Sequence, residues 1–561
     1  MSEAAFDYVV VGSGSAGGAL AARLSEDPSV SVLLLEAGPG NASPLLHIPA
    51  AARYAFNASR FNWDFETEPE PELKGRVLPQ ARGRVLGGSS SINGMVYLRG
   101  NPLDYEGWAE LGATGWSYAD VLPYFQRLEA WDKPTNEYQG RTGPIGVSTP
   151  TPINPISQAF LDAGTEAGYE PTEDVNGFRQ EGFGRFPMNA AHGYRWSTAR
   201  GYLRRARRRP NLEIMTRCVA DRIEFSGKKA VALHYRQAGR AKTVRFRREV
   251  VLAASAFNSP KLLMLSGVGP ATQLRAHGID VVHDLPGVGE NLMDHQISSI
   301  QLACTQPVSL YRHLGLLAQG KALLQWLISR DGVLASNHFE CGAFIRSEPG
   351  VKFPDIQLYL FPVAVMEGSK DFMKLHGFQV QLSPQRSLAK GTVRLRSARP
   401  DDPPEIRFNY MTEPRDWVEF RKAFRIAREV VAQPAMDPYR GRELLPGDAV
   451  QTDDEIDDYV RDHMQSSYHP CGTCKMGVDD MAVVDPDCRV RGVAGVRVAD
   501  SSIMPMIPTC NLNSPSIMIG ERAADLIHGK SLPPSNLGYH VDEQWEARQR
   551  PGTALRPHPD L

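Results

Sequence analysis

The chain has 561 residues, more than one compact domain usually holds, so we expect two closely connected domains. Its 62 basic and 64 acidic residues give a formal net charge of -2. This balance gives no reason to expect nucleic acid as a partner and favours a small or neutral ligand. The content of 42% hydrophobic and 22% charged residues is typical of an ordinary globular protein.

We expect neither a secretory signal nor a membrane span in this chain. No run approaches the roughly 18 uncharged apolar residues of a membrane span. The N-terminus leads almost directly into a strand-like run, without room for the basic region and cleavage site of a secretory signal. Seven scattered cysteines do not form a disulfide scaffold. We therefore expect a cytoplasmic protein, and peripheral contact with the inner face of the membrane stays open.

Residues 6–38 predict a βαβ unit. An apolar strand over 8–11 is followed by a glycine-rich turn, a helix with apolar spacing and a second strand over 32–35. Residues 249–267 predict another strand, turn and helix. The pattern indicates a Rossmann-like domain of the α/β class.

Other parts of the chain mix proline-rich loops, alternating strands and amphipathic helices, which predicts a second domain with an antiparallel sheet and helices. We assign it to residues 151–190 and 301–460, as an interleaved substrate-binding domain in a fold that is α+β overall. The predicted nucleotide-binding domain is discontinuous and comprises residues 1–150, 191–300 and 461–531. Residues 532–561 lack periodic apolar spacing and read as an extended C-terminal arm, either wrapped on the protein or solvated.

The glycine-rich turn matches the dinucleotide-binding pattern GxGxxG. Gly12 permits the tight turn, Gly14 lets the backbone approach a pyrophosphate, and Gly17 allows close packing of the helix. Glu36 ends the second predicted strand and is placed to accept hydrogen bonds from ribose hydroxyls. An acid at this position disfavours NADP, but the pattern by itself does not separate NAD from FAD.

A second glycine cluster, "GRVLGGSSSINGMVYLRG", occupies residues 83–100, and three further motifs lie at 255–269, 285–295 and 511–525. Together these motifs resemble the glucose-methanol-choline (GMC) family of FAD-dependent oxidoreductases, in its branch of choline and alcohol dehydrogenases. The similarity extends over nearly the whole chain. One departure is Ser255, which stands where the family motif opens with glycine.

The resemblance implies FAD as cofactor. Some relatives attach FAD covalently through a histidine in the second glycine cluster, where this chain has Ile92, so we expect non-covalent FAD. The residues expected to contact the cofactor are Gly12, Gly14, Ser15, Ala16, Gly17, Glu36, Ala37, Gly88, Ser89, Asn93, Gly94, Met95, Val219 and Asp500.

The resemblance also implies the oxidation of a primary alcohol to an aldehyde, with hydride transfer to flavin N5. The hydroxyl proton requires a base, and a histidine suits this role because its ordinary pKa lies near neutral pH. The resemblance assigns the base to His469 and the group that orients the alcohol oxygen to Asn513. We expect Asn513 or Ser514 to cap a helix that begins there.

Tyr468, Trp63 and Glu340 are candidates for the wall of the substrate cavity. Aromatic rings with a carboxylate would suit choline, which is the alternative substrate to other primary alcohols. Oxygen and a quinone-like carrier both stay open as electron acceptor, and so does the oligomeric state.

The segment "SSYHPCGTCKMG" offers an alternative from another class. Cys471 and Cys474, with His338 and Glu340, fit the two halves of a zinc deaminase signature. A long stretch of chain separates the halves, and this interpretation leaves both glycine clusters without a role. We therefore expect no metal, no redox function for the two cysteines, and a packing role for both thiols.

Overall fold

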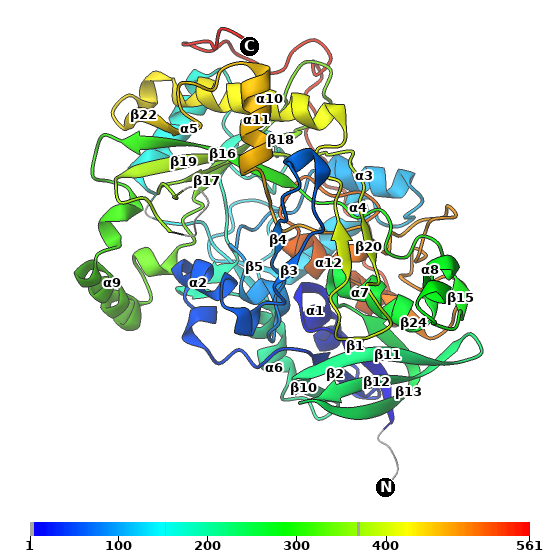
Figure 1. Cartoon of the computed structure of the whole chain (residues 1–561). Helices are drawn as coiled ribbons and strands as arrows, with labels where there is room; N and C mark the ends of the chain where they lie inside the picture. Colours follow the sequence, from blue (N-terminus) through cyan, green and yellow to red (C-terminus); the bar gives the residue numbers. More distant parts are fainter. Residues whose placement is uncertain (1–4, 152, 367–370) are drawn as a thin grey trace.

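Two sheets, each with its own hydrophobic core, form the body of the protein (Figure 1). The computed structural model describes residues 5–151, 153–366 and 371–561. In Figure 1 the first sheet lies at the lower right and the second at the upper left. The helices α1 (Ser15–Leu24), α7 (Ser255–Leu265) and α12 (Asn513–Ile527) lie between them.

The first sheet forms the Rossmann-like unit. Its strands, in spatial order, are β10 (Leu212–Thr216), β2 (Val32–Glu36), β1 (Ala5–Val11), β13 (Arg240–Leu252), β12 (Lys229–Gln237) and β11 (Cys218–Ser226), and β24 (Val496–Val498) also pairs with β13. Strands β10, β2, β1, β13 and β24 are parallel, whereas β12 and β11 extend the sheet in antiparallel fashion. Strand β2 is buried along its whole length, as expected for a parallel strand covered on both faces.

The second sheet is antiparallel. Its strands, in spatial order, are β22 (Arg440–Leu445), β16 (Gln296–Cys304), β19 (Gly377–Pro384), β18 (Ile356–Phe361), β17 (Cys341–Ile345) and β7 (Gly182–Arg185). The long helix α10 (Pro414–Val431) packs on this sheet through an apolar stripe that includes Phe420, Phe424 and Ala427.

The remaining elements are short or peripheral. The other helices are α2 (Ala52–Phe56), α3 (Pro102–Glu110), α4 (Tyr118–Leu128), α5 (Pro155–Glu166), α6 (Arg204–Ala206), α8 (Ala271–Ala276), α9 (Leu316–Ser329) and α11 (Asp453–His463). The other strands are β3 (Phe65–Glu66), β4 (Pro79–Gln80), β5 (Glu129–Trp131), β6 (Ile145–Val147), β8 (Ala190–Ala191), β9 (Tyr194–Arg195), β14 (Val268–Gly269), β15 (His283–Asp284), β20 (Thr392–Arg394), β21 (Glu405–Arg407) and β23 (Gln465–Ser466). In the described part of the chain, no helix combines the length and apolar character that crossing a bilayer requires.

The predicted fold class, a Rossmann-like α/β unit combined with an antiparallel sheet and helices, is confirmed. The exact domain limits stay a prediction. Strand β16 spans the expected limit between residues 300 and 301, and β23, from the expected nucleotide-binding segment, pairs with it. The helix α12 begins at Asn513 with Leu512 as its N-cap, so the expected cap at Asn513 or Ser514 is wrong by one or two residues.

The C-terminal arm lies against the body of the protein. The amide of Ser535 donates to the carbonyl of Ala119 at 2.8 Å. Further along, Asp542 forms an ion pair of 2.7 Å with Arg346, whose guanidinium is buried. Since both contacts hold the arm on the surface of this chain, the solvated alternative is not what the structure shows.

Candidate active site

The two glycine clusters meet at the N-terminal end of α1. Gly12 has a φ of +99°, and a Cβ placed there would lie 2.4 Å from the carbonyl oxygen of Ala253. Gly88, in the second cluster, has a φ of +53°, and its Cβ would lie 2.6 Å from the Cα of Gly14. Only glycine permits this approach of the two loops. The backbone amides at the start of α1 therefore face a narrow, side-chain-free space that suits a phosphate.

Glu36 joins the same two loops. Its Oε2 accepts hydrogen bonds from the amide and the hydroxyl of Ser13, at 3.2 and 2.6 Å, and its Oε1 accepts from the amide of Gly38 at 2.8 Å. The hydroxyl of Ser13 in turn accepts from the amide of Gly87 at 3.1 Å. Burial raises the pKa of Glu36. Its Oε1 retains acceptor capacity toward the cavity, as the predicted ribose contact requires.

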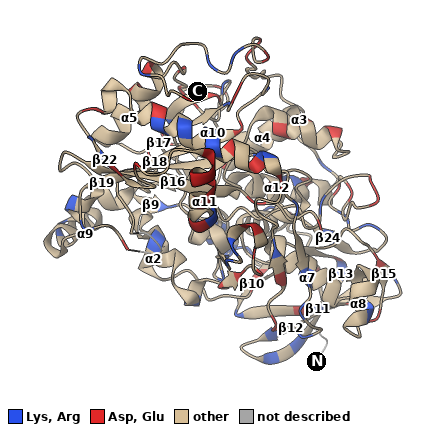
Figure 2. Ribbon diagram, turned by 45° about the horizontal axis from the view of Figure 1, so that its top comes forward, with Lys and Arg blue, Asp and Glu red and all other residues tan. Residues whose placement is uncertain are grey.

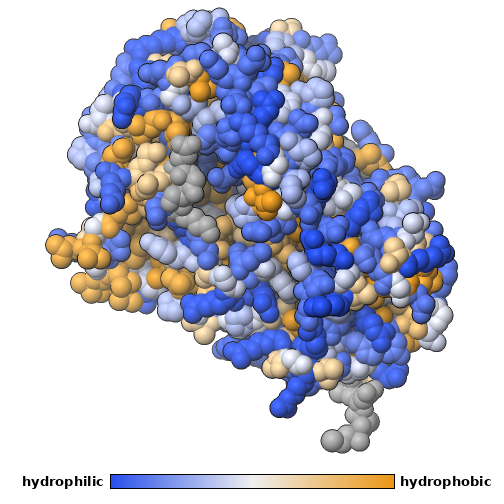
Figure 3. Space-filling model, viewed as in Figure 1, coloured by the Kyte–Doolittle hydropathy of each residue, from blue (hydrophilic) through white to orange (hydrophobic). Residues whose placement is uncertain are grey.

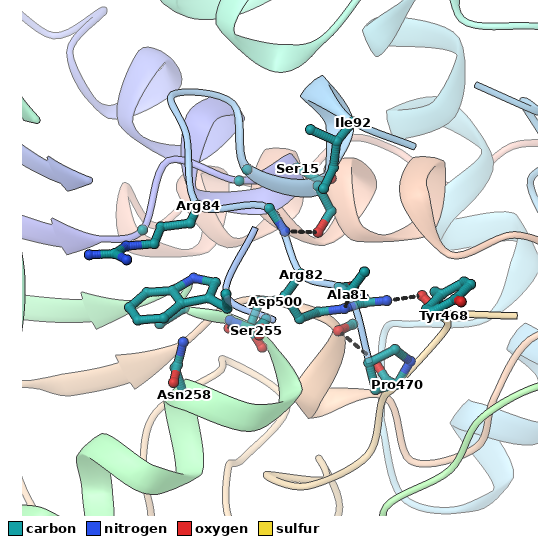
Figure 4. A pocket seen from close by; sticks show the side chains of 18 of the residues that line it. Ser15, Ala81, Arg82, Arg84, Ile92, Ser255, Asn258, Tyr468, Pro470 and Asp500 are labelled. Atoms are coloured by element: carbon teal, nitrogen blue, oxygen red, sulfur yellow. Dashed lines mark hydrogen bonds between the residues drawn. The ribbon is translucent and has the colours of Figure 1, made fainter. Parts of the chain in front are cut away.

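A cavity of about 780 Å³ extends from this region to His469. In Figure 4 the labelled wall residues run from Arg84 at one end to Tyr468 and Pro470 at the other. The predicted cofactor contacts that line it are Gly12, Gly14, Ser15, Ala16, Glu36, Ala37, Gly88, Ser89, Asn93, Gly94, Met95, Val219 and Asp500. Gly17 is the exception, because it packs α1 against the loop, where a Cβ would lie 2.0 Å from the carbonyl oxygen of Gly12.

Ser255 keeps the backbone conformation that the usual glycine would have. Its φ is +81°, an uncommon value for a residue with a side chain. Asp500 holds it there, since the Oδ2 of Asp500 accepts from the amide of Ser255 at 2.8 Å and from the hydroxyl of Ser259 at 2.6 Å. Its Oδ1 accepts twice more, from Ser502. Asp500 therefore shapes the cavity wall with four bonds to the protein.

His469 lies in the cavity wall with a defined set of partners. Its Nδ1 lies 3.0 Å from the Nδ1 of the buried His295, and its Nε2 lies 3.1 Å from the Nδ2 of Asn511. The backbone amide of His469 donates to Asp294 at 2.7 Å. Burial, with smaller effects of His295 and Arg82, lowers the pKa of His469 well below its ordinary value. The ring is therefore neutral at pH 7.

The hydrogen bonds around this ring suit one tautomer. The side chain of Asn511 accepts from the hydroxyl of Tyr359 at 3.1 Å and turns its Nδ2 toward the Nε2 of His469. This orientation of the amide fits a ring with an unprotonated Nε2 and a proton on Nδ1, toward His295. An unprotonated Nε2 in the cavity wall is the arrangement that a general base needs.

Two asparagines, rather than one, lie at this end of the cavity. Asn513 accepts a hydrogen bond from the hydroxyl of Ser15 at 2.8 Å, and its own Nδ2 is buried without a partner. Asn511, which the sequence analysis assigned no role, is the one that contacts His469. Both line the cavity.

The three predicted substrate contacts separate into two groups. Tyr468 and Trp63 line the cavity, and Arg82 donates to the carbonyl oxygen of Tyr468 (Figure 4). Glu340 does not line it. Its carboxylate is buried and accepts from the amide of Asn154 at 2.6 Å, so the prediction that Glu340 faces the substrate is wrong. Burial also raises the pKa of Glu340.

The segment that holds the two cysteines has no metal-binding geometry. Cys471 and Cys474 are buried free thiols, and burial raises the pKa of both. Within residues 5–151, 153–366 and 371–561, no group of three His, Cys, Asp or Glu side chains is placed to hold a metal ion. The zinc deaminase alternative therefore finds no support.

Comparison with known proteins establishes the family of this chain. A family model described as GMC oxidoreductase matches residues 6–297, and the model of its C-terminal part matches residues 387–520. The chain belongs to the GMC oxidoreductase family. Among its relatives is the oxygen-dependent choline dehydrogenase of Brucella ovis, 50% identical over 548 residues, or 97% of this chain and 100% of that protein.

Solved structures of GMC oxidoreductases share the fold. Pyridoxine 4-oxidase from Mesorbium loti is 30% identical, with a TM-score of 0.85 over 94% of this chain and 100% of that one. Formate oxidase from Aspergillus oryzae, studied for its FAD modification, is 26% identical, with a TM-score of 0.87 over 94% of this chain and 99% of that one. This protein is therefore an FAD-dependent oxidoreductase that acts on CH–OH donors.

The residues of the cavity fit FAD. The glycine loops leave a space that a Cβ would fill, the buried Nδ2 of Asn513 lacks an acceptor, and Glu36 retains acceptor capacity. These groups face one continuous cavity, as an extended dinucleotide requires.

Sequence reasoning missed several groups around the site. His295 belongs to the motif at 285–295, but nothing in the motif shows that its ring meets His469. Asn511 lies two positions before Asn513, and the fold places both at the cavity. Arg82 directly precedes the second glycine cluster, and only the structure shows that its side chain donates to the backbone of Tyr468.

The approach of the two glycine loops gives a first prediction. In Gly88→Ala, the new methyl group would meet the Cα of Gly14, so we expect the loops to separate and the FAD content of the purified protein to fall at least about tenfold. The flavin absorbance per mole of protein measures this. Gly40→Ala is the matched control, because no atom lies within 4 Å of its Cβ position. Full FAD content in Gly88→Ala would contradict the prediction.

Proposed function

We propose that this GMC oxidoreductase oxidises a neutral primary alcohol to the aldehyde, with His469 as the general base. The observation that supports the proposal is the position of His469 in the wall of the FAD cavity, with its Nε2 facing the Nδ2 of Asn511. Bound FAD supplies the hydride acceptor.

In the proposed mechanism, the chain holds the alcohol and removes its proton. The alcohol hydroxyl takes the place of the Asn511 amide as donor to the Nε2 of His469, which receives the proton. The Nδ2 groups of Asn511 and Asn513 supply donors for the alcohol oxygen, and this extends the predicted role of Asn513 to a pair of amides. The hydrogen bond from Nδ1 to His295 persists when His469 becomes positively charged, and it keeps the ring oriented.

The wall around His469 supports a neutral substrate. Glu340, the carboxylate that favoured choline in the sequence, is bound to the amide of Asn154. Asp294, the carboxylate nearest to the His469 backbone, is buried and accepts from His469, Tyr410 and Ser466. Aromatic groups such as Tyr468, Phe339 and Tyr359 line the cavity instead. Such a wall binds an apolar or aryl group well, and its rings would offer a quaternary ammonium cation–π contacts.

Choline oxidation is the second candidate, and the choline dehydrogenase relatives at 50% identity favour it. We propose to separate the two with choline and 3,3-dimethyl-1-butanol, which have the same shape and differ only in the charge. Aliphatic, aryl and polyol alcohols complete the panel, each assayed with oxygen and with a soluble dye. We expect kcat/KM for a neutral alcohol to exceed that for choline by at least about tenfold. A clear preference for choline over its uncharged analogue would overturn the neutral-substrate proposal.

The proposal has three further parts. FAD is bound non-covalently, the electron acceptor is oxygen or a quinone-like carrier, and the protein is cytoplasmic. Ile92 supports the first, because its side chain lines the cavity where some relatives have a histidine. Denaturation that releases all of the flavin into solution tests it, and the comparison of oxygen with dye tests the acceptor.

Removal of the base tests the mechanism directly. We expect His469→Ala to slow the anaerobic bleaching of the flavin by the best alcohol about 10²- to 10⁴-fold, because no other group accepts the hydroxyl proton. The FAD content should stay at the wild-type level. His277→Ala, at the end of α8 and away from the cavity, is the control. A rate close to wild type in His469→Ala would exclude this residue as the base.

His295 provides a test of ring orientation. We expect His295→Leu, which removes the acceptor for the Nδ1 proton of His469, to lower kcat about 10- to 100-fold with little change in KM. His295→Asn retains an acceptor oxygen and should recover much of the loss. Equal losses in both variants, or a loss confined to KM, would contradict an orienting role.

A further inference from the structure

The helix α9 (Leu316–Ser329) is strongly apolar, yet the protein buries little of it. Only Ala322 and Trp326 are buried among its 14 residues. Leu316 and Leu317 are 88% and 86% exposed, and Leu323, Leu324, Leu327 and Ile328 are also exposed. An apolar helix on a protein surface normally turns its apolar face inward. Here the apolar face points outward.

The exposed residues form one continuous stripe. At 100° per residue, positions 316, 317, 323, 324, 327 and 328 fall on one side of the helix, and Ala322 and Trp326 fall on the opposite side. Figure 1 shows α9 projecting at the lower left, and Figure 3 shows hydrophobic surface at the same place. We call this surface the α9 stripe.

The orientation of α9 is fixed by its inner side. The Nε1 of Trp326 donates to the carbonyl oxygen of Gly193 at 2.7 Å, and its ring meets Tyr194 edge to face at 5.3 Å. The guanidinium of Arg330 stacks on the ring of Trp326 at 4.2 Å. Rotation of the stripe toward the body would break the contacts of Trp326 with Gly193 and Tyr194.

Basic residues border the α9 stripe. Lys321 is the only charged residue within α9, which carries no acidic residue in Figure 2. At its C-terminal end, Arg330 and Arg200 lie over the same ring of Tyr194, at 5.2 and 4.0 Å. Burial, with a smaller effect of the charge of Arg204, lowers the pKa of Arg200.

The arginines of this group lack acidic partners. Lys321, Arg330 and Arg200 form no ion pair with a described residue. A surface that combines an outward apolar stripe with unpaired cations suits the boundary of an anionic bilayer, where acyl chains cover the apolar groups and phosphates approach the cations.

We propose that the α9 stripe, with Lys321, Arg330 and Arg200 as its basic residues, docks this protein onto a bilayer that contains anionic lipid. With 14 residues, α9 is about 21 Å long, too short to cross a membrane and suited to lie in the interface plane. The docking is independent of the substrate proposed above.

A second copy of the chain fits this surface less well. A stripe about 21 Å long and about 10 Å wide covers roughly 200 Å² per partner, well below the roughly 800 Å² of a stable interface. A symmetric pair would also bring Lys321 and the arginines of both copies together, which costs free energy.

The position of α9 gives the docking a consequence for the active site. The chain leaves α9 through a short turn at Val333–Ala335 and reaches Asn337, whose side chain donates to the carbonyl oxygen of Gly94 at 2.9 Å. Phe339 then lines the cavity. A bilayer bound at α9 therefore lies near a segment of the cavity wall, as an electron acceptor carried in the lipid phase would require.

Sedimentation of the FAD-loaded protein with vesicles tests the proposal. We expect the protein to pellet with vesicles of phosphatidylcholine and phosphatidylglycerol, and to bind at least about tenfold more weakly to vesicles of phosphatidylcholine alone. Raising the salt from about 0.1 M to about 0.5 M should weaken the binding. Wild-type protein that stays in the supernatant with both kinds of vesicle would overturn the proposal.

Matched variants locate the docking surface. The triple variant Leu317→Ser/Leu324→Ser/Ile328→Ser should weaken binding at least about tenfold, because each substitution removes apolar area from the interface with the bilayer. The control Val77→Ser/Val478→Ser/Leu555→Ser replaces exposed apolar residues elsewhere and should bind as wild type.

Three further outcomes would count against the proposal. An equal loss in the control variant would indicate nonspecific adsorption, and unchanged binding of the α9 variant would exclude this helix. Light scattering that shows a wild-type dimer, converted to monomer by the α9 variant without vesicle binding, would assign the stripe to a second copy. Turnover with a soluble dye is measured separately, so that a failure of docking is distinguishable from a failure of the proposed activity.

Discussion

The contact between the Gly14 and Gly88 loops is the constraint on which the active site depends. A Cβ on Gly88 would lie 2.6 Å from the Cα of Gly14, so neither loop leaves room for a side chain at the crossing. Ser13 and Glu36 tie the same loops together through buried hydrogen bonds. The floor of the FAD cavity is therefore made of backbone, as the proposed site for the pyrophosphate requires.

The reactive end of the cavity depends on a different kind of constraint, a carboxylate that organises polar groups. Asp294 is buried and accepts from the amide of His469, the hydroxyl of Tyr410 and the hydroxyl of Ser466, and burial raises its pKa to about 6. The adjacent His295 then meets the ring of His469. Two consecutive residues just before β16 thus hold the backbone of the proposed base and contact its ring.

Local patterns in the sequence predicted the βαβ unit with little error, because GxGxxG, the apolar strands and the terminal acid are all contiguous. The predicted strand over 8–11 lies within β1, and Glu36 ends β2. The same approach failed at Glu340, which was a candidate for the cavity wall because a carboxylate beside aromatic rings would suit choline. The structure shows its carboxylate bound to the amide of Asn154, a residue far away in the sequence. Nothing local to Glu340 indicates that partner.

The sequence by itself determined the cofactor class, the family and the identity of the candidate base, because each is encoded in a short motif whose residues act together. Only the tertiary structure decided how the segment "SSYHPCGTCKMG" works. In the fold the two cysteines are buried, His295 lies at the Nδ1 of His469, and Asn511 lies at the Nε2 of His469. It also decided that the apolar side of α9 faces outward, since a hydrophobic pattern specifies a face but not the surface that the face meets.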